Sequence, residues 1–104
     1  MSDELTGRLV FSKSGRDKGT AYILVGISRQ GFFLLADGKL RKIEKPKLKN
    51  PKHVQLTNRS DQMICEQLKH GRNPENYVIQ NAIGQLLETK KNDGERGALD
   101  NAER

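Results

Sequence analysis

The chain has 104 residues and a single cysteine, so it supports one small domain and excludes an internal disulfide. It carries 19 Lys and Arg against 13 Asp and Glu, and no apolar stretch approaches the roughly 18 residues that span a bilayer. The N-terminal residues lack a secretory signal pattern. Together these features predict a soluble cytoplasmic protein whose net charge of +6 favours a polyanionic partner.

The positive charge is concentrated in the first half of the chain. Residues 8–53 contain 12 Lys and Arg against three Asp and Glu, a net charge of +9, whereas the remainder is net negative. The densest part is "KLRKIEKPKLKNPKH", residues 39–53, where Glu44 is the only acid. Lysines protect exposed strand edges, but that role needs only a few of them, so we interpret this segment as a nucleic-acid contact. Pro46 and Pro51 oppose the amphipathic helix that usually lies on a membrane surface.

Short apolar runs separated by turn residues predict five strands in this first half, at residues 8–13, 20–28, 32–36, 40–44 and 53–57. Asp37-Gly38 is typical of a two-residue hairpin turn between the third and fourth runs. Pro46 has no N–H for a ladder and therefore ends the fourth run. Five short strands joined by tight turns predict a small antiparallel barrel, over residues 1–58.

The second and third runs are apolar at consecutive positions rather than at alternate ones, so both faces of those strands need cover. The second half of the chain, residues 59–89, supplies two predicted helices. Ser60 is a candidate N-cap for the first, which Gly71 ends, and Asn73 with Pro74 is a candidate start for the second.

The second predicted helix carries one apolar stripe, formed by Ile79, Ile83, Leu86 and Leu87. We expect this stripe to pack on the barrel, with helix-mediated dimerisation as the alternative. Residues 90–104 have too few apolar side chains to offset the entropy of ordering, so we expect a disordered tail.

The loop "SKSGRDKGTAY", residues 12–22, contains more than a tight turn requires. Gly15 and Gly19 allow backbone conformations closed to other residues and a close approach to a partner. Arg16 offers a planar fork for two contacts to one phosphate, and Lys18 offers a point charge. Asp17 between them breaks the row of cations. We therefore expect the loop to contact phosphate, while Gly19 itself serves mainly a backbone requirement.

This loop, the hydrophobic strand after it and the continuation "LLADGKLRKIEKPK" together resemble the KOW motif. Counting from Leu9, Gly19 falls at the eleventh position, where that family carries its glycine. The likeness covers residues 7–57 and is greatest to small bacterial KOW proteins akin to large-subunit ribosomal proteins. It implies an SH3-like barrel that binds RNA in association with the ribosome.

Neither enzymatic nor metal chemistry is predicted. The sequence has no phosphate-binding "GxxxxGK[ST]" loop, no nucleophile elbow and no convincing carboxylate pair. The five-residue spacing of Cys65 and His70 matches no zinc pattern, and Cys65 is expected in the core. Phe32 and Phe33 are likewise expected in the core rather than on a base-stacking surface. We thus expect no catalytic residue, no cofactor and no metal.

Two functional hypotheses follow. The first is an RNA-binding, ribosome-associated module whose contacts come from Arg16, Lys18, Arg41, Lys42, Lys45, Lys47, Lys49 and Lys52, with Gly15 and Gly19 as motif glycines. The second is a protein-interaction module that binds RNA polymerase or another transcription or translation factor. The charge favours the first hypothesis, because a barrel that binds a protein does not need the net charge of +9 that residues 8–53 carry.

Replacing Gly19 by Val tests the backbone requirement. A β-branched residue held at positive φ costs of order 1–3 kcal/mol, a large share of the stability of a small domain. We expect Gly19→Val to lower the melting temperature markedly. A variant that melts with the parent would show that residue 19 has no backbone role.

Overall fold

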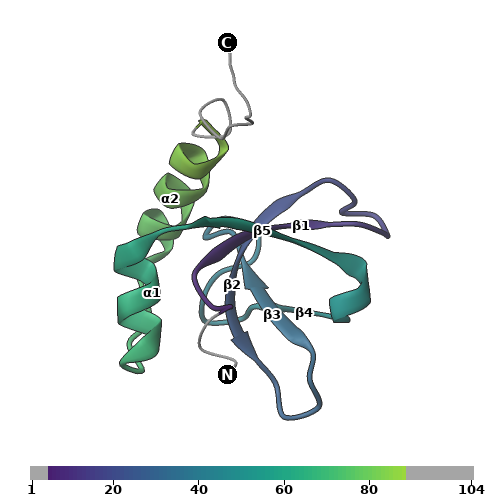
Figure 1. Cartoon of the computed structure of the whole chain (residues 1–104), viewed down its shortest axis with the longest axis horizontal. Coiled ribbons are helices and arrows are strands. Elements are labelled where there is room, and N and C mark those ends of the chain that lie inside the picture. Colours follow the sequence, from purple (N-terminus) through teal and green to yellow (C-terminus); the bar gives the residue numbers. More distant parts are fainter. Residues whose placement is uncertain (1–4, 89–104) are drawn as a thin grey trace.

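The computed structural model describes residues 5–88, which form one five-stranded antiparallel sheet and two helices. Neighbouring strands in the sheet follow the order β4-β3-β2-β1-β5 (Figure 1). The strands are β1 (Arg8–Ser12), β2 (Ala21–Ile27), β3 (Phe33–Ala36), β4 (Lys47–Lys49) and β5 (Val54–Ser60), followed by α1 (Gln62–Lys69) and α2 (Asn76–Glu88). The chain is therefore mainly β, as the sequence predicts.

The sheet is curled, because consecutive strands β4 and β5 lie at its opposite edges. Five residue steps separate Lys49 from Val54 and span at most about 18 Å, whereas four strand spacings in a flat sheet cover about 19 Å. The 3-10 helix Pro51–His53 shortens the connection further. Register shifts in the β1–β5 and β2–β3 pairs add local bends.

Both faces of the central strand β2 are buried, which confirms that its unbroken apolar run needs cover on two sides. Tyr22 and Leu24 face the concave interior of the sheet, whereas Ile23 faces the helices. The interior cluster contains Val10, Tyr22, Leu24, Phe33, Leu35 and Val54. The cluster under the helices contains Ile23, Ala36, Ile64, Ile79 and Ala82.

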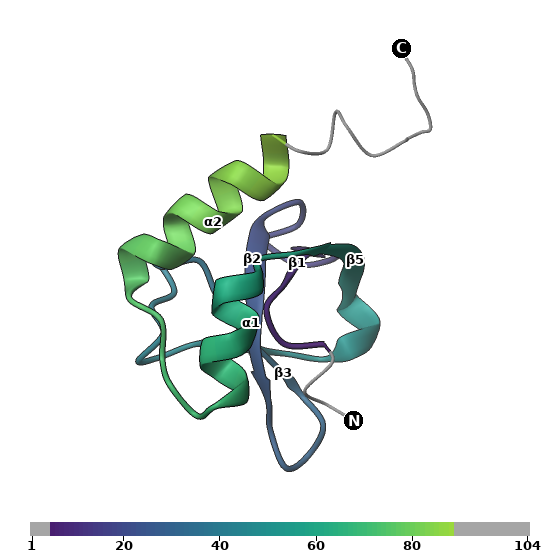
Figure 2. The same cartoon turned by 60° about the vertical axis from the view of Figure 1, so that its left-hand side comes forward.

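The helices pack on the convex face of the sheet, to one side of it (Figure 2). Ile79 is fully buried there, and Ile83 and Leu86 pack against the same cluster, whereas Leu87 is 40% exposed. Most of the predicted apolar stripe is thus used within the chain. Neither described helix is long and apolar enough to cross a membrane. The predicted disordered segment, residues 90–104, lies outside the described residues.

The predicted fourth strand at residues 40–44 is wrong: β4 lies at Lys47–Lys49, where it pairs with β3. Asp37-Gly38 does not make a two-residue hairpin but opens a loop over residues 37–46. The N–H of Ile43 donates to the side chain of Asn76 at 2.8 Å instead of to a strand. Pro46 consequently precedes the fourth strand rather than ending it.

Both predicted helix starts are also displaced. Ser60 still pairs with Arg8 in the sheet, so the next residue, Asp61, caps α1 by accepting the N–H of Ile64 at 2.9 Å. The second helix begins at Asn76 rather than after Asn73. Pro74 lies two residues before the helix and is fully buried, so this proline contributes packing.

Two side chains expected in the core are only partly buried. Phe32 is 37% exposed, whereas its neighbour Phe33 is buried. Cys65 is half-buried, and its thiol donates to the carbonyl of Thr6 at 3.3 Å.

Glycine substitutions test how the 37–46 loop sits on α2. Gly38 has a φ of +79°, and a Cβ there would overlap the carbonyl oxygen of Asn76. We expect Gly38→Ala to cost about 2–4 kcal/mol of the free energy of unfolding, measured by denaturant titration. Gly84 is the matched control, because a Cβ in that helical position meets nothing within 4 Å. Gly84→Ala should stabilise by about 0.5–1 kcal/mol, and equal effects of the two changes would contradict the contact.

Candidate nucleic-acid interface

The loop between β1 and β2 is a tight, hydrogen-bonded turn. The N–H of Gly19 donates to the carbonyl of Ser12 at 2.8 Å, and the N–H of Ser12 donates to the carbonyl of Thr20 at 3.0 Å. Gly15 and Gly19 have φ values of +85° and +89°, the region that favours glycine. A Cβ on Gly19 would meet nothing within 4 Å, so its requirement is conformational rather than one of space.

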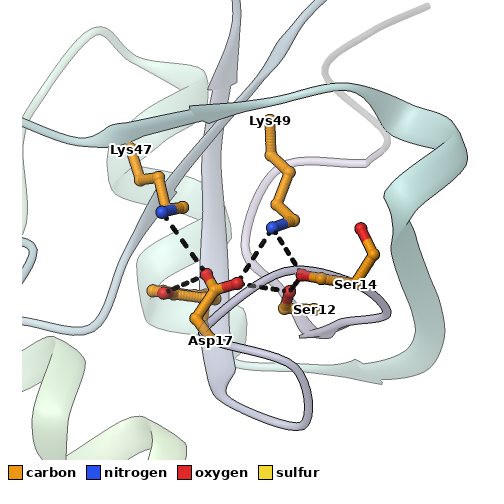
Figure 3. Close-up of polar contacts among 6 residues, drawn as sticks. Ser12, Ser14, Asp17, Lys47 and Lys49 are labelled. Carbon is orange, nitrogen blue, oxygen red and sulfur yellow. Dashed lines mark hydrogen bonds and ion pairs between the residues drawn. The ribbon is translucent and has the colours of Figure 1, made fainter.

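The carboxylate of Asp17 lies at the centre of this loop and binds three strands together (Figure 3). It accepts hydrogen bonds from Ser12 Oγ at 2.8 Å, from Tyr22 OH at 2.7 Å and from Lys49 Nζ at 2.9 Å. Lys47 Nζ lies 3.6 Å away as a second cation. The network joins the ends of β1 and β2 to β4 at the sheet edge.

Burial and these hydrogen-bond partners shift the pKa values of both Asp17 and Tyr22. Partial burial by itself raises the pKa of Asp17, but the hydrogen bonds from Lys49, Tyr22 and Ser12, with the charge of Lys47, lower it well below the usual range. Burial, then the hydrogen bond to Asp17 and its charge, raises the pKa of Tyr22. Asp17 therefore remains a carboxylate and Tyr22 a donor.

The carboxylate of Asp17 is engaged within the protein, whereas the cations on either side of it are exposed. Arg16 and Lys18 are exposed, and within the described residues neither side chain forms an ion pair. Because the Asp17 carboxylate already fixes the backbone of this loop, little conformational entropy of the loop is lost when its exposed cations bind a ligand. This arrangement suits contact with an external anion.

An open cleft of about 390 Å³ joins this loop to the basic segment. Its cations come from three separate segments: Arg16 from the first loop, Arg41 from the 37–46 loop and Lys47 from β4. The remaining lining residues are Asp17, Thr20, Tyr22, Asp37 and Leu40. Side chains far apart in the sequence thus meet in one positively charged hollow.

The 37–46 loop is stabilised by hydrogen bonds within the loop and by a hydrogen bond from α2. Asp37 Oδ1 accepts the N–H groups of Lys39 and Arg41 at 2.9 and 2.8 Å, which closes the turn. From α2, Gln80 Nε2 donates to the carbonyl of Gly38 at 2.7 Å. Arg41 is therefore presented from an anchored loop.

Asn76, the first residue of α2, holds the far end of the same loop. Its side chain accepts the N–H of Ile43 and donates to Glu44 at 3.0 Å. The hydrogen bond from Asn76 lowers the pKa of the exposed Glu44 carboxyl. The amide thus stabilises the charged form of the one acid in the segment 39–53.

The structure divides the predicted contact residues into two groups. Six are exposed, and within residues 5–88 none of their side chains forms an ion pair: Arg16, Lys18, Arg41, Lys42, Lys45 and Lys52. The other two, Lys47 and Lys49, face Asp17, and their side chains are 27% and 11% exposed. Lys49 also donates to the carbonyl of Ser14 at 3.0 Å, so it stabilises the loop from within.

Sequence reasoning missed the residues that shape the surface. In the sequence Asp17 is only a break in a row of cations, and Asp37 is only half of a turn signal. A lone acid among basic residues, followed five positions later by a tyrosine, is the signal that could have identified Asp17. Nothing local to Asn76 or Gln80 indicates that either anchors a loop more than 30 residues earlier in the sequence.

Within the described part of the chain no group of three or more His, Cys, Asp or Glu side chains could hold a metal ion. No protein-family model and no curated protein matches the chain.

The pKa of Asp17 predicts an acid-sensitive fold. Because the folded-state pKa lies below the unfolded value near 3.9, the carboxylate contributes stability above that value, which is lost as pH falls toward the folded pKa. Asp17→Asn should cost about 2 kcal/mol at pH 7, the range for hydrogen bonds to a charged group. Between about pH 5 and pH 2 the parent should lose more stability than the variant does.

The measurement is the free energy of unfolding in urea at several pH values. Glu66→Gln is the control, since its carboxylate is exposed and only 3.8 Å from the exposed His70 ring. An exposed pair of this kind contributes at most about 1 kcal/mol. Parallel pH profiles for the parent and Asp17→Asn would contradict the role of the Asp17 network.

Proposed function

We propose that this protein is an RNA-binding module that acts in association with the ribosome, through a KOW motif carried on an SH3-like barrel. The observation that supports it most strongly is the meeting of Arg16, Arg41 and Lys47 from three segments at one open cleft. Residues 8–53 carry a net charge of +9, and most of the cations predicted to contact RNA are exposed. Exposed basic side chains of this kind are what polyanion binding uses.

The fold is consistent with the proposal. The sheet is curled, its edge strands β4 and β5 are joined by one short helical turn, and its interior is filled by apolar side chains. We propose that it closes as an SH3-like barrel. Gly19 takes a positive φ in the loop that resembles the motif, as a backbone requirement there demands.

The mechanism is contact with phosphate and 2′-hydroxyl groups of folded RNA, reading shape more than sequence. Arg16 offers a planar fork that binds two phosphate oxygens at once, and Arg41 places a second guanidinium in the same cleft. Lys18, Lys42, Lys45 and Lys52 add point charges that release counterions. Lys47 and Lys49 contribute mainly by holding the first loop through Asp17.

Sedimentation of a cell lysate through a sucrose gradient tests the cellular partner. We expect the protein to travel with ribosomal particles and to be released by high salt, because phosphate contacts are salt-sensitive. Co-migration with RNA polymerase instead would favour the protein-interaction hypothesis.

A double charge change tests the surface directly. Arg16→Gln with Arg41→Gln removes two exposed cations that line the cleft, and both are outside the core. We expect binding to a structured RNA to weaken by at least about tenfold at 0.1 M salt. The plot of log affinity against log salt should flatten by up to about two units, at most one for each cation that the variant removes.

The matched control is Lys69→Gln with Arg72→Gln, which removes the same charge from exposed positions at the end of α1 and just beyond it. Each variant is also checked for an unchanged melting temperature. If the two double variants show equal decreases in affinity and in salt slope, binding follows net charge alone, and the proposed surface is wrong.

A further inference from the structure

The cleft contains two side chains that phosphate binding does not explain. Asp37 places a carboxylate among Arg16, Arg41 and Lys47, where it opposes an anionic ligand. Leu40 is 84% exposed at the same cleft, the largest exposed fraction among the exposed large apolar side chains of the described residues. A ligand that is only a chain of phosphates has no use for either group.

One carboxylate oxygen of Asp37 accepts hydrogen bonds within the loop, and the other is available to a ligand. Oδ1 accepts the N–H groups of Lys39 and Arg41, which saturates its lone pairs. Within the described residues Oδ2 has no hydrogen-bond partner, and Asp37 forms no ion pair with the cations that share the cleft. The carboxylate therefore has a free acceptor for hydrogen-bond donors of a ligand.

The arginine beside it offers the complementary chemistry. Arg41 follows Leu40 directly and lines the same cleft as Asp37. A guanidinium donates only and a carboxylate accepts only. A ligand edge that fits this pair carries donors on one side and an acceptor on the other.

Among the four RNA bases, the Watson–Crick edge of guanine has this pattern. It presents two adjacent donors, N1–H and N2–H, next to the O6 acceptor. Adenine and cytosine each place a ring-nitrogen acceptor beside their one amino group, and uracil flanks its single N–H with two carbonyls. A carboxylate placed as it would be against guanine meets an acceptor in each of these three bases, and reorienting adenine or cytosine gives it one donor atom instead of two.

We propose that the cleft binds a single unpaired guanosine nucleotide of an RNA, an inference that rests on the RNA-binding function proposed above. Asp37 Oδ2 accepts N1–H and N2–H, Arg41 donates to O6, and Leu40 packs on a face of the base. Arg16 holds the adjoining phosphate.

The guanosine is unpaired because its Watson–Crick edge is engaged by cytosine in a duplex. The cleft volume of about 390 Å³ lies in the range of roughly 300–1,000 Å³ that small-ligand sites occupy. The basic surface around it supplies affinity for the rest of the RNA, while the cleft selects one base within it.

Binding is measured for the full chain with a set of RNA hairpins that differ in one bulged nucleotide, namely G, A, C, U or inosine, and with the same hairpin lacking a bulge. We expect the G bulge to bind about tenfold more tightly than the A, C and U bulges. Inosine lacks the N2 amine and should bind with an intermediate affinity. Equal affinity for all bulges would overturn this inference but leave the RNA-binding function standing, whereas no binding to any hairpin would overturn both.

The substitution Asp37→Asn tests whether the free oxygen of Asp37 recognises the base. The asparagine carbonyl can still accept the N–H groups of Lys39 and Arg41, while a donor replaces the free acceptor. We expect the preference for the G bulge to fall below about threefold. Loss of a negative charge should at the same time leave binding to the bulge-free hairpin unchanged or slightly stronger.

Glu66→Gln removes the same charge from the exposed surface of α1 and should keep the full preference. A purely electrostatic role of Asp37 predicts instead that Asp37→Asn strengthens binding to every hairpin by the same factor. That result, or a retained preference for G in a folded Asp37→Asn protein, would overturn the inference.

A titration with 5′-GMP and 5′-AMP separates an RNA nucleotide from a free one. Chemical shifts of the Leu40 methyl groups should respond to 5′-GMP only at millimolar concentration, because the surrounding phosphate contacts are missing. An affinity for 5′-GMP equal to that for the G-bulge hairpin would assign the cleft to a free nucleotide and overturn the proposal.

Discussion

The carboxylate of Asp17 is the contact on which the arrangement of the basic surface depends. It receives a hydroxyl from β1, a phenol from β2 and an ammonium from β4, so a single side chain connects the loop to both the middle and the edge of the sheet. A negative charge withdrawn from solvent is stable only with such partners. Satisfying it turns Lys49 inward and leaves Arg16 and Lys18 outside.

The sequence predicted the strands whose apolar residues are buried by neighbouring strands, and it failed where distant residues decide the conformation. The runs that became β1, β2, β3 and β5 have strong β propensity and clear turn signals. The run "LRKIE" has a similar pattern, but Ile43 packs under the helices and its N–H binds Asn76. No local pattern encodes a partner 33 residues away.

The candidate surface was predictable as a region but not as a set of contacts. Charge density alone located residues 39–53, because that signal does not depend on how the chain turns. Which lysines face solvent depends on pairing with Asp17, so Lys49 and Lys52, three residues apart, have opposite environments. The cleft itself requires three segments to meet, which only the folded sheet achieves.

The hydrogen bonds from α2 to the 37–46 loop make the helical layer and the basic loop one cooperative unit. Asn76 and Gln80 hold the loop, while Ile79 on the same helix is fully buried against the sheet. Opening of this loop therefore requires displacement of a helix anchored in the core, unlike the fraying of a free surface loop. Amide hydrogens of the loop should accordingly exchange with solvent at rates governed by unfolding of α2.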